Sequence, residues 1–277
     1  MKKIKKFLQD FIKLTREIMG HHVAAYSAQS SYFFMLSLIP IILLLLTLVQ
    51  YTPVTKADVM AAVFQFFPGS INTMLTSIVN QVYNQSMGII PITVVVALWS
   101  AGKGVLALTN GLNTIFGCPE TRNYVYLRLR STVYTVIFIM MLIIMLVLSV
   151  FGNSINTFII AHIPLAAHVA GVLIKARGII MPAILVIVLT FCYKYLPNSN
   201  DLVLKKQLPG AVFAAVGWML CSWVFSVYVD IFKGFQDMYG SLTTIVLIML
   251  WMYFCMYCIL LGGEINMRYS DKIFDEN

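Results

Sequence analysis

The chain has 277 residues, of which 60% are hydrophobic and only 11% are charged, and its net charge is +8 at pH 7. A soluble domain carries about a quarter charged residues, so this composition excludes an ordinary soluble protein. The hydrophobic residues form six runs without Asp, Glu, Lys or Arg, each roughly as long as, or longer than, the about 20 residues that a membrane span needs. These runs are Val23–Thr55, Val59–Gly102, Ser131–Ile174, Gly178–Tyr193, Gln207–Val229 and Met238–Gly263. The sequence therefore predicts an all-α integral membrane protein with six transmembrane helices.

The basic residues gather in four clusters, which hold 14 of the 19 lysines and arginines. The clusters are Lys2, Lys3, Lys5, Lys6, Lys13 and Arg16; Arg122, Arg128 and Arg130; Lys194, Lys205 and Lys206; and Arg268 and Lys272. With six spans and a cytoplasmic N-terminus, all four fall on the cytoplasmic side, as the positive-inside rule requires. We therefore expect an inner-membrane protein with both termini in the cytoplasm. The high net charge then needs no nucleic-acid partner.

The first 20 residues have an amphipathic helical pattern. Their apolar face holds Ile4, Phe7, Leu8, Phe11, Leu14 and Ile18. A cationic amphipathic helix suits the anionic cytoplasmic surface of the membrane, and a solvated cytoplasmic helix is the alternative. Residues 21–270 are predicted to form one transmembrane domain, and residues 271–277 a cytoplasmic tail.

The first predicted span covers about Ala24–Gln50, with a polar first half and an apolar second half interrupted by Pro40. After it, the outer segment Tyr51–Met87 contains apolar residues at helical spacing over residues 71–82. We expect an uncharged amphipathic helix there, on the outer membrane surface or capping the bundle.

The second span begins near Gly88 and leaves two placements open for Lys103. If the helix continues to about Phe116, Lys103 lies well inside the membrane. If the span ends at Gly104, Lys103 snorkels to the cytoplasmic interface. The remaining predicted segments are a third span from after Arg130 to about Phe151, an outer loop over Gly152–Ile174, and spans over about Ile179–Leu196, Leu208–Val229 and Tyr239–Gly263, the last ending at Glu264.

Motifs for catalysis are scarce. The eleven acidic residues are spread over ends and loops, and no H-x-x-x-H, D-x-D, nucleophile or phosphate-loop motif is present. The five cysteines are interpreted as buried thiols, because Cys255 and Cys258 form a C-x-x-C motif without the second ligand pair that zinc needs. We therefore expect no enzyme activity, no cofactor and no metal site.

Pairs of small residues four apart occur in the first and fifth spans and allow helices to approach closely. They are Ala24 with Ala28, Ser27 with Ser31, Gly210 with Ala214, and Ala211 with Ala215. Packing within one chain is the favoured interpretation and dimerisation the alternative, so the oligomeric state stays open.

Polar and ionisable groups converge on the cytoplasmic half of the predicted bundle. The candidate functional residues are Tyr26, Gln29, Tyr32, Lys103, Asn113, Arg122, Glu264 and Asn266. Ionisable groups at membrane depth face water or the bundle interior, so these residues are predicted to line an inward-facing polar cavity. The alternative is that they hold helices together by hydrogen bonds, with Glu264 at the cytoplasmic boundary, capping nearby amides or paired with Arg268.

Several stretches resemble the YihY/virulence factor BrkB family of bacterial membrane proteins. They are Ala25–Leu46, Trp99–Gly117, Glu120-Thr121-Arg122, Tyr193–Asn198, Pro209-Gly210-Ala211 with Trp218, and Tyr239–Asn266 with its Y-G-S-L…W-x-Y…G-x-E-x-N pattern. Gly263 and Thr243 depart from the family's Ala and Gly. The resemblance implies six spans in the inner membrane, and it carries an old label, ribonuclease BN, that these residues do not support. Matching positions without a catalytic role are Tyr32, Pro40, Asn113, Arg122, Tyr193, Pro197, Gly240, Trp251, Glu264 and Asn266.

The sequence thus favours a transporter-like or lipid- and envelope-related membrane protein. Its cavity would take an amphipathic or small polar cargo, and membrane lipids would be its partners. A structural or partner-binding membrane protein is the alternative, and a membrane-associated ribonuclease is disfavoured.

Overall fold

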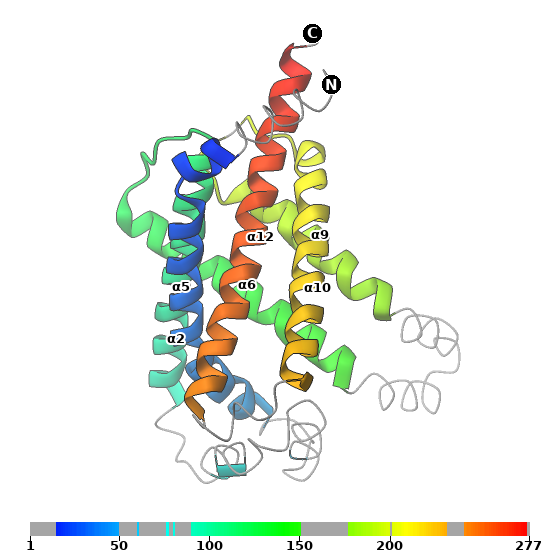
Figure 1. Ribbon diagram of the computed structural model, residues 1–277. Helices are drawn as coiled ribbons and strands as arrows, with labels where there is room; N and C mark the ends of the chain where they lie inside the picture. Colours follow the sequence, from blue (N-terminus) through cyan, green and yellow to red (C-terminus); the bar gives the residue numbers. More distant parts are fainter. Residues whose placement is uncertain are drawn as a thin grey trace, which may run out of the picture. The chain divides into compact units, whose positions relative to one another are not determined.

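The computed structural model describes residues 15–49, 90–150, 177–199, 201–231 and 241–275, with a few single positions between 60 and 80. All secondary structure in these residues is helical (Figure 1). A short helical stretch over residues 15–20 is followed by α2 (Val23–Val49), α5 (Ile90–Ile115), α6 (Tyr124–Val150), α9 (Arg177–Tyr195), the 3-10 helix η3 (Leu204–Gln207), α10 (Leu208–Ile231) and α12 (Ser241–Asp275). The predicted all-helical class is confirmed.

Three stretches of the described residues are long and apolar enough to cross a membrane. They are Gly178–Tyr195, Leu204–Tyr228 and Ile245–Tyr269. Helices α2, α5 and α6 have 27, 26 and 27 residues. At 1.5 Å per residue each also exceeds the length of a 30 Å hydrocarbon core. The predicted number of six spans goes beyond the three stretches found.

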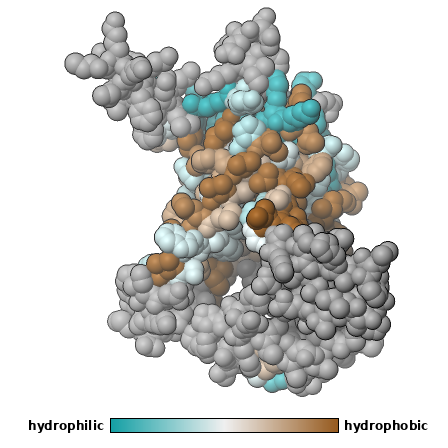
Figure 2. Space-filling view, turned by 90° about the vertical axis from the view of Figure 1, so that its right-hand side faces the viewer, coloured by the Kyte–Doolittle hydropathy of each residue, from teal (hydrophilic) through white to brown (hydrophobic). Residues whose placement is uncertain are grey.

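Large hydrophobic side chains lie exposed on these helices, as they must if lipid replaces water around them. On α10 the exposed large hydrophobic residues are Leu208, Val212, Phe213, Val216, Met219, Leu220, Trp223, Val224, Val227 and Tyr228. Figure 2 shows hydrophobic side chains over much of the described surface and hydrophilic side chains gathered toward one end. Extensive apolar surface of this kind marks contact with a membrane or with another protein.

The chain divides into two compact units. The first unit comprises Met1–Phe33, Lys103–Ser131 and Pro182–Asn277, and the second comprises Phe34–Gly102 and Thr132–Met181. All the side-chain contacts described below lie within the first unit.

Helices α10 and α12 pack directly against each other through small residues. Ala211, Ala214 and Ala215 are buried. A methyl group on Gly262 would stand 2.5 Å from the Gly210 carbonyl oxygen, so the two backbones meet where neither glycine leaves room for a side chain. The small residues predicted at this end of α10 therefore serve packing within one chain.

The observed helix ends can be compared with three predicted boundaries. Helix α5 continues through Lys103 to Ile115, close to the end at about Phe116 that the first of the two alternatives predicted for the helix. Helix α6 begins at Tyr124, ahead of the predicted start of the third span after Arg130, and Asn123 Oδ1 accepts the Val125 N–H at 3.0 Å. Helix α12 continues to Asp275, past the predicted end of the sixth span at Glu264.

Some predictions fall outside the described residues. These are most of the N-terminal amphipathic helix, the outer helix over residues 71–82 apart from single helical positions, and the outer loop over residues 152–174.

Candidate functional site: a polar pocket at the end of α5

The C-terminal end of α5 is shaped by a glycine. Gly117 has a φ of 63°, a left-handed conformation that a residue with a side chain adopts only at a cost. Around it, the Gly117 N–H donates to the Thr114 carbonyl at 3.3 Å and the Cys118 N–H donates to the Asn113 carbonyl at 2.9 Å. These two bonds make a Schellman motif, which caps the helix and reverses the chain. The reversal brings the following residues back over the last turns of α5.

A pocket of about 450 Å³ lies at this helix end, within the range of small-molecule sites. One wall comes from α5, a second from the chain after Gly117, and a third from Tyr26 of α2. The lining residues are Tyr26, Asn110, Asn113, Thr114, Gly117, Cys118, Pro119 and Glu120. The hydroxyl of Thr114 lies 3.2 Å from Tyr26 Oη and 3.0 Å from the Asn110 carbonyl oxygen, so Tyr26 is tied to the helix that forms the opposite wall.

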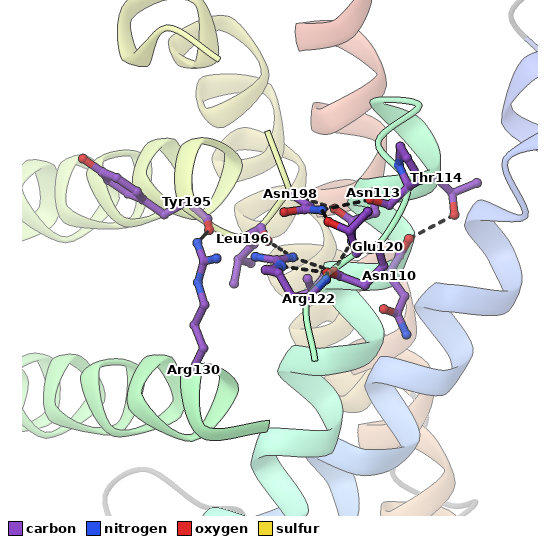
Figure 3. Close-up of polar contacts among 12 residues, drawn as sticks. Asn110, Asn113, Thr114, Glu120, Arg122, Arg130, Tyr195, Leu196 and Asn198 are labelled. Carbon is purple, nitrogen blue, oxygen red and sulfur yellow. Dashed lines mark hydrogen bonds and ion pairs between the residues drawn. The ribbon is translucent and has the colours of Figure 1, made fainter. Parts of the chain in front are cut away.

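A hydrogen-bonded network centred on Glu120 fixes the floor of the pocket (Figure 3). Its Oε1 accepts bonds from the Arg122 backbone N–H at 3.0 Å and from Arg122 Nε at 2.7 Å. Its Oε2 accepts bonds from Arg122 Nη2 at 2.6 Å and from Asn113 Nδ2 at 2.7 Å. The Arg122 side-chain hydrogen bonds, more than any other cause, hold the pKa of the Glu120 carboxyl below its ordinary value.

The turn after α9 locks this network in place. Asn113 Oδ1 accepts the Asn198 backbone N–H at 2.8 Å, and Asn198 Nδ2 donates to the Pro119 carbonyl at 2.9 Å. Arg122 Nη2 also donates to the Leu196 carbonyl at 3.3 Å. Arg130 of α6 donates to the Tyr195 carbonyl at the end of α9 (Figure 3). The pocket therefore rests on a frame that three helix ends build together, and its wall is formed in advance of any ligand.

Glu264 lies elsewhere, in a buried pair. Its side chain is 1% exposed, and its Oε1 lies 2.6 Å from Nδ1 of His21. The predicted alternative pairing with Arg268 is wrong, because Arg268 pairs with Glu17. Glu17 of the helical stretch over residues 15–20 is followed four positions later by His21, and Glu264 of α12 is followed four positions later by Arg268. The two pairs therefore form side by side between the chain's N-terminal side and α12 rather than along one helix.

Asn266, also predicted for the cavity, joins α12 to the start of α10. It is fully buried, its Oδ1 accepts the Gly210 N–H at 2.7 Å, and its Nδ2 donates to the Gln207 carbonyl at 3.0 Å. Both of these partners are backbone groups, so Asn266 holds two helices together and does not line the pocket.

The remaining candidates lie on α2 and α5, away from the lining. The Lys103 ammonium stands 5.4 Å from the centre of the Phe33 ring, a cation–π contact. Tyr32 is exposed and packs edge-on against Phe33, and Gln29 is exposed. Of the eight predicted residues, Tyr26 and Asn113 line the pocket and Arg122 supports it.

Sequence reasoning missed several residues of this site. Thr114, Cys118 and Glu120 line the pocket, and Asn198 anchors it. A glycine placed after an apolar helical run predicts a helix C-terminus. Applied to Gly117, that signal would have pointed to the residues on either side of it.

Metal chemistry has no visible support in this part of the chain. Among the described residues, no group of three or more His, Cys, Asp or Glu side chains could hold a metal ion. All five cysteines are free thiols.

Comparison with known proteins agrees with the helical, membrane-like architecture. A family model described as virulence factor BrkB matches residues 14–277. The chain belongs to the virulence factor BrkB family. This BrkB-family chain is 34% identical over 260 residues to the ribonuclease-like protein YfkH of Bacillus subtilis (strain 168), covering 93% of this chain and 94% of the relative.

The BrkB-family chain also has shorter matches to proteins named UPF0761 membrane proteins. The one from Stenotrophomonas maltophilia (strain K279a) is 28% identical over 28% of this chain and 18% of its own length. The one from Pseudoalteromonas translucida (strain TAC 125) is 30% identical over 30% of this chain and 28% of its own length. No solved structure matches the chain. Family and composition together identify a membrane protein.

Proposed function

We propose that this BrkB-family protein is a six-span inner-membrane protein with cytoplasmic termini, and that the pocket at the end of α5 binds a small polar or amphipathic cargo. The role is transporter-like or lipid-handling. The pocket itself is the observation that carries the proposal: about 450 Å³ of space, with polar walls and a preformed frame. A structure that served only to join helices would have no need of that space.

The orientation rests on where the basic residues lie. Arg122, Arg128 and Arg130 flank the start of α6, Lys194 ends α9, and Lys205 and Lys206 lie in η3. The pocket is formed at the same helix ends, beside Arg122. Because cytoplasmic loops collect Lys and Arg, the pocket is assigned to the cytoplasmic side.

The alternative, that the polar residues only hold helices together, has specific support only away from the pocket. Asn266 and the pair of Glu264 with His21 are committed to partners within the chain. In the pocket, by contrast, no hydrogen bond joins the Asn110 side chain to another described residue. A ribonuclease role would rest on the name of YfkH alone, since the described residues hold no metal-binding cluster.

Accessibility of Cys118 tests the proposal, because its thiol lines the pocket. A variant that keeps Cys118 as its only cysteine is treated with a membrane-impermeant maleimide, once in inside-out vesicles and once in spheroplasts. We expect labelling in inside-out vesicles alone. A second variant carries Cys in place of Gly178, at the opposite end of α9, and should be labelled in spheroplasts. A Cys118 thiol that is unreactive from both sides, or reactive from outside, refutes the proposal.

A further inference from the structure

The electrical charge of the pocket is balanced before any ligand arrives. Of the eight lining residues only Glu120 carries a charge, and its two oxygens accept four hydrogen bonds. An ionised carboxylate offers about four acceptor sites, so none remains for a ligand. Three of the four bonds come from Arg122, whose positive charge cancels that of Glu120.

A charged ligand would gain little in such a pocket. Ions lose their hydration on entering a pocket, and only a close, uncommitted opposite charge offsets that cost. A cation would find the Glu120 oxygens occupied and Arg122 behind them. An anion would face the Glu120 carboxylate before it reached the guanidinium.

The hydrogen-bonding groups left over in the pocket are neutral. Asn113 is committed, because its amide binds Glu120 and the backbone of Asn198. Asn110 keeps a side-chain amide, which offers both a donor and an acceptor. The Thr114 hydroxyl has one hydrogen for two acceptors, Tyr26 Oη at 3.2 Å and the Asn110 carbonyl at 3.0 Å, so Tyr26 Oη keeps an acceptor site for a ligand in either arrangement.

Close helix packing holds Tyr26 beside α5, the helix that carries Asn110. A methyl group on Gly111 would stand 3.0 Å from Cβ of Tyr26, so the glycine lets α2 approach α5 just below the pocket. The pocket lining thus includes both an aromatic ring and a side-chain amide. A molecule with neighbouring hydroxyl groups on a C–H framework suits this lining, because each hydroxyl is both a donor and an acceptor for Tyr26 and Asn110.

Resting on the proposed function, we propose that the pocket binds a neutral, hydroxyl-bearing group, a sugar or polyol, either free or as the headgroup of a lipid. Tyr26 and Asn110 are the residues that recognise it. Glu120 and Arg122 are positioning residues that shape the pocket and make no bond to the ligand.

A series of probes with the same octyl chain and different headgroups tests the proposal. The rate of Cys118 alkylation in inside-out vesicles is measured with octyl glucoside, octylammonium or octyl phosphate, each below its micellar concentration, and with glucose. At about ten times its Kd a bound probe should slow labelling about tenfold. We expect octyl glucoside to protect and the two charged compounds not to. Protection by glucose as well identifies a free sugar as the source, and protection by octyl glucoside alone identifies a lipid headgroup.

Two variants and a matched control assign the effect to the named side chains. Tyr26→Phe removes only a hydroxyl, and Asn110→Ala removes only the amide, so each should weaken protection by octyl glucoside about tenfold. Tyr32→Phe makes the same change at an exposed position on the same helix, and it should leave protection unchanged.

The outcomes separate the ligand class from the pocket itself. Protection by a charged compound but not by octyl glucoside overturns the neutral class while the pocket still binds. Equal protection by all three octyl compounds would mean that the pocket recognises the octyl chain, and this result also overturns the neutral class. The assignment to Tyr26 and Asn110 is overturned if octyl glucoside protects the Tyr26→Phe and Asn110→Ala variants as well as it protects the parent. A Cys118 thiol that never reacts refutes the proposed function instead.

Discussion

Replacing Asn266 by leucine removes two buried hydrogen bonds while keeping the side chain nearly the same size. The lost bonds join α12 to the Gly210 N–H and the Gln207 carbonyl. Gly210 is the third residue of α10, where backbone N–H groups have no partner within the helix. Asn266 therefore caps α10 from the neighbouring helix, and no water reaches the site to take its place, because the side chain is fully buried.

The expected loss follows from those two bonds. A buried donor or acceptor left unsatisfied costs about 1–3 kcal/mol, so Asn266→Leu should lower the free energy of unfolding by about 2–6 kcal/mol. The matched control is Asn123→Leu, which removes one hydrogen bond at the exposed start of α6. Loss of such a cap costs about 1 kcal/mol.

The assay is unfolding of the purified protein in mixed micelles, with increasing fractions of a denaturing detergent. The parent protein and both variants are compared at one temperature and pH. A destabilisation by Asn266→Leu no larger than that of Asn123→Leu would refute the reasoning, since it would mean that the two backbone groups find other partners.

Three more outcomes follow from the contacts of the first unit. Gly262→Ala should lower the melting temperature, because its methyl group would meet the Gly210 carbonyl oxygen at 2.5 Å, whereas Gly20→Ala, with nothing within 4 Å, should not. Because the folded protein lowers the pKa of Glu120, the pairing stabilises the fold above the ordinary carboxyl pKa of 4.5, and this stabilisation is lost as the pH falls below it. A pH series of melting temperatures should therefore be flatter for Glu120→Gln, and an unchanged slope below pH 4.5 would count against the pairing. The thiols of Cys221 and Cys258 lie 3.8 Å apart, so mild oxidation with copper phenanthroline should join their two peptides in a mass spectrum, and their absence would argue against direct packing of α10 on α12.

Hydrophobic runs and charge placement predict the helices well where both signals agree. The predicted fourth and fifth spans differ from α9 and α10 by two residues or fewer at each end. There, a basic residue or a proline-containing turn stands directly beside the apolar run. Helices α6 and α12 instead extend several residues beyond the predicted spans. Arg128 and Arg130 lie within α6, and Glu264 lies within α12, because a helix continues past the membrane boundary as long as its backbone bonds do.

The partners of the polar residues were beyond sequence reasoning for a different reason. Glu264 and His21 are separated by 243 positions, and nothing local in either segment marks the other. The pocket shows the same limit. Asn113 was singled out for its polarity within a span, but its meaning depends on Glu120 after the turn and on Asn198 after another helix. Those contacts depend on how the ends of different helices meet, and the spacing of hydrophobic residues along one helix does not predict that.

The crossing of α10 and α12 decides which parts of the first unit are able to move. At Gly210 and Gly262 the two backbones touch, Asn266 bonds across the contact, and further along Trp251 Nε1 donates to Ser222 Oγ at 3.2 Å. Rotation of one helix against the other needs free space between them, and this contact has none. Helices α10 and α12 therefore behave as one rigid body. The width of the pocket then depends on how α2 lies against Gly111 of α5, where the close approach is made by the Cβ of Tyr26 and the side chain of Leu260 rather than by two backbones.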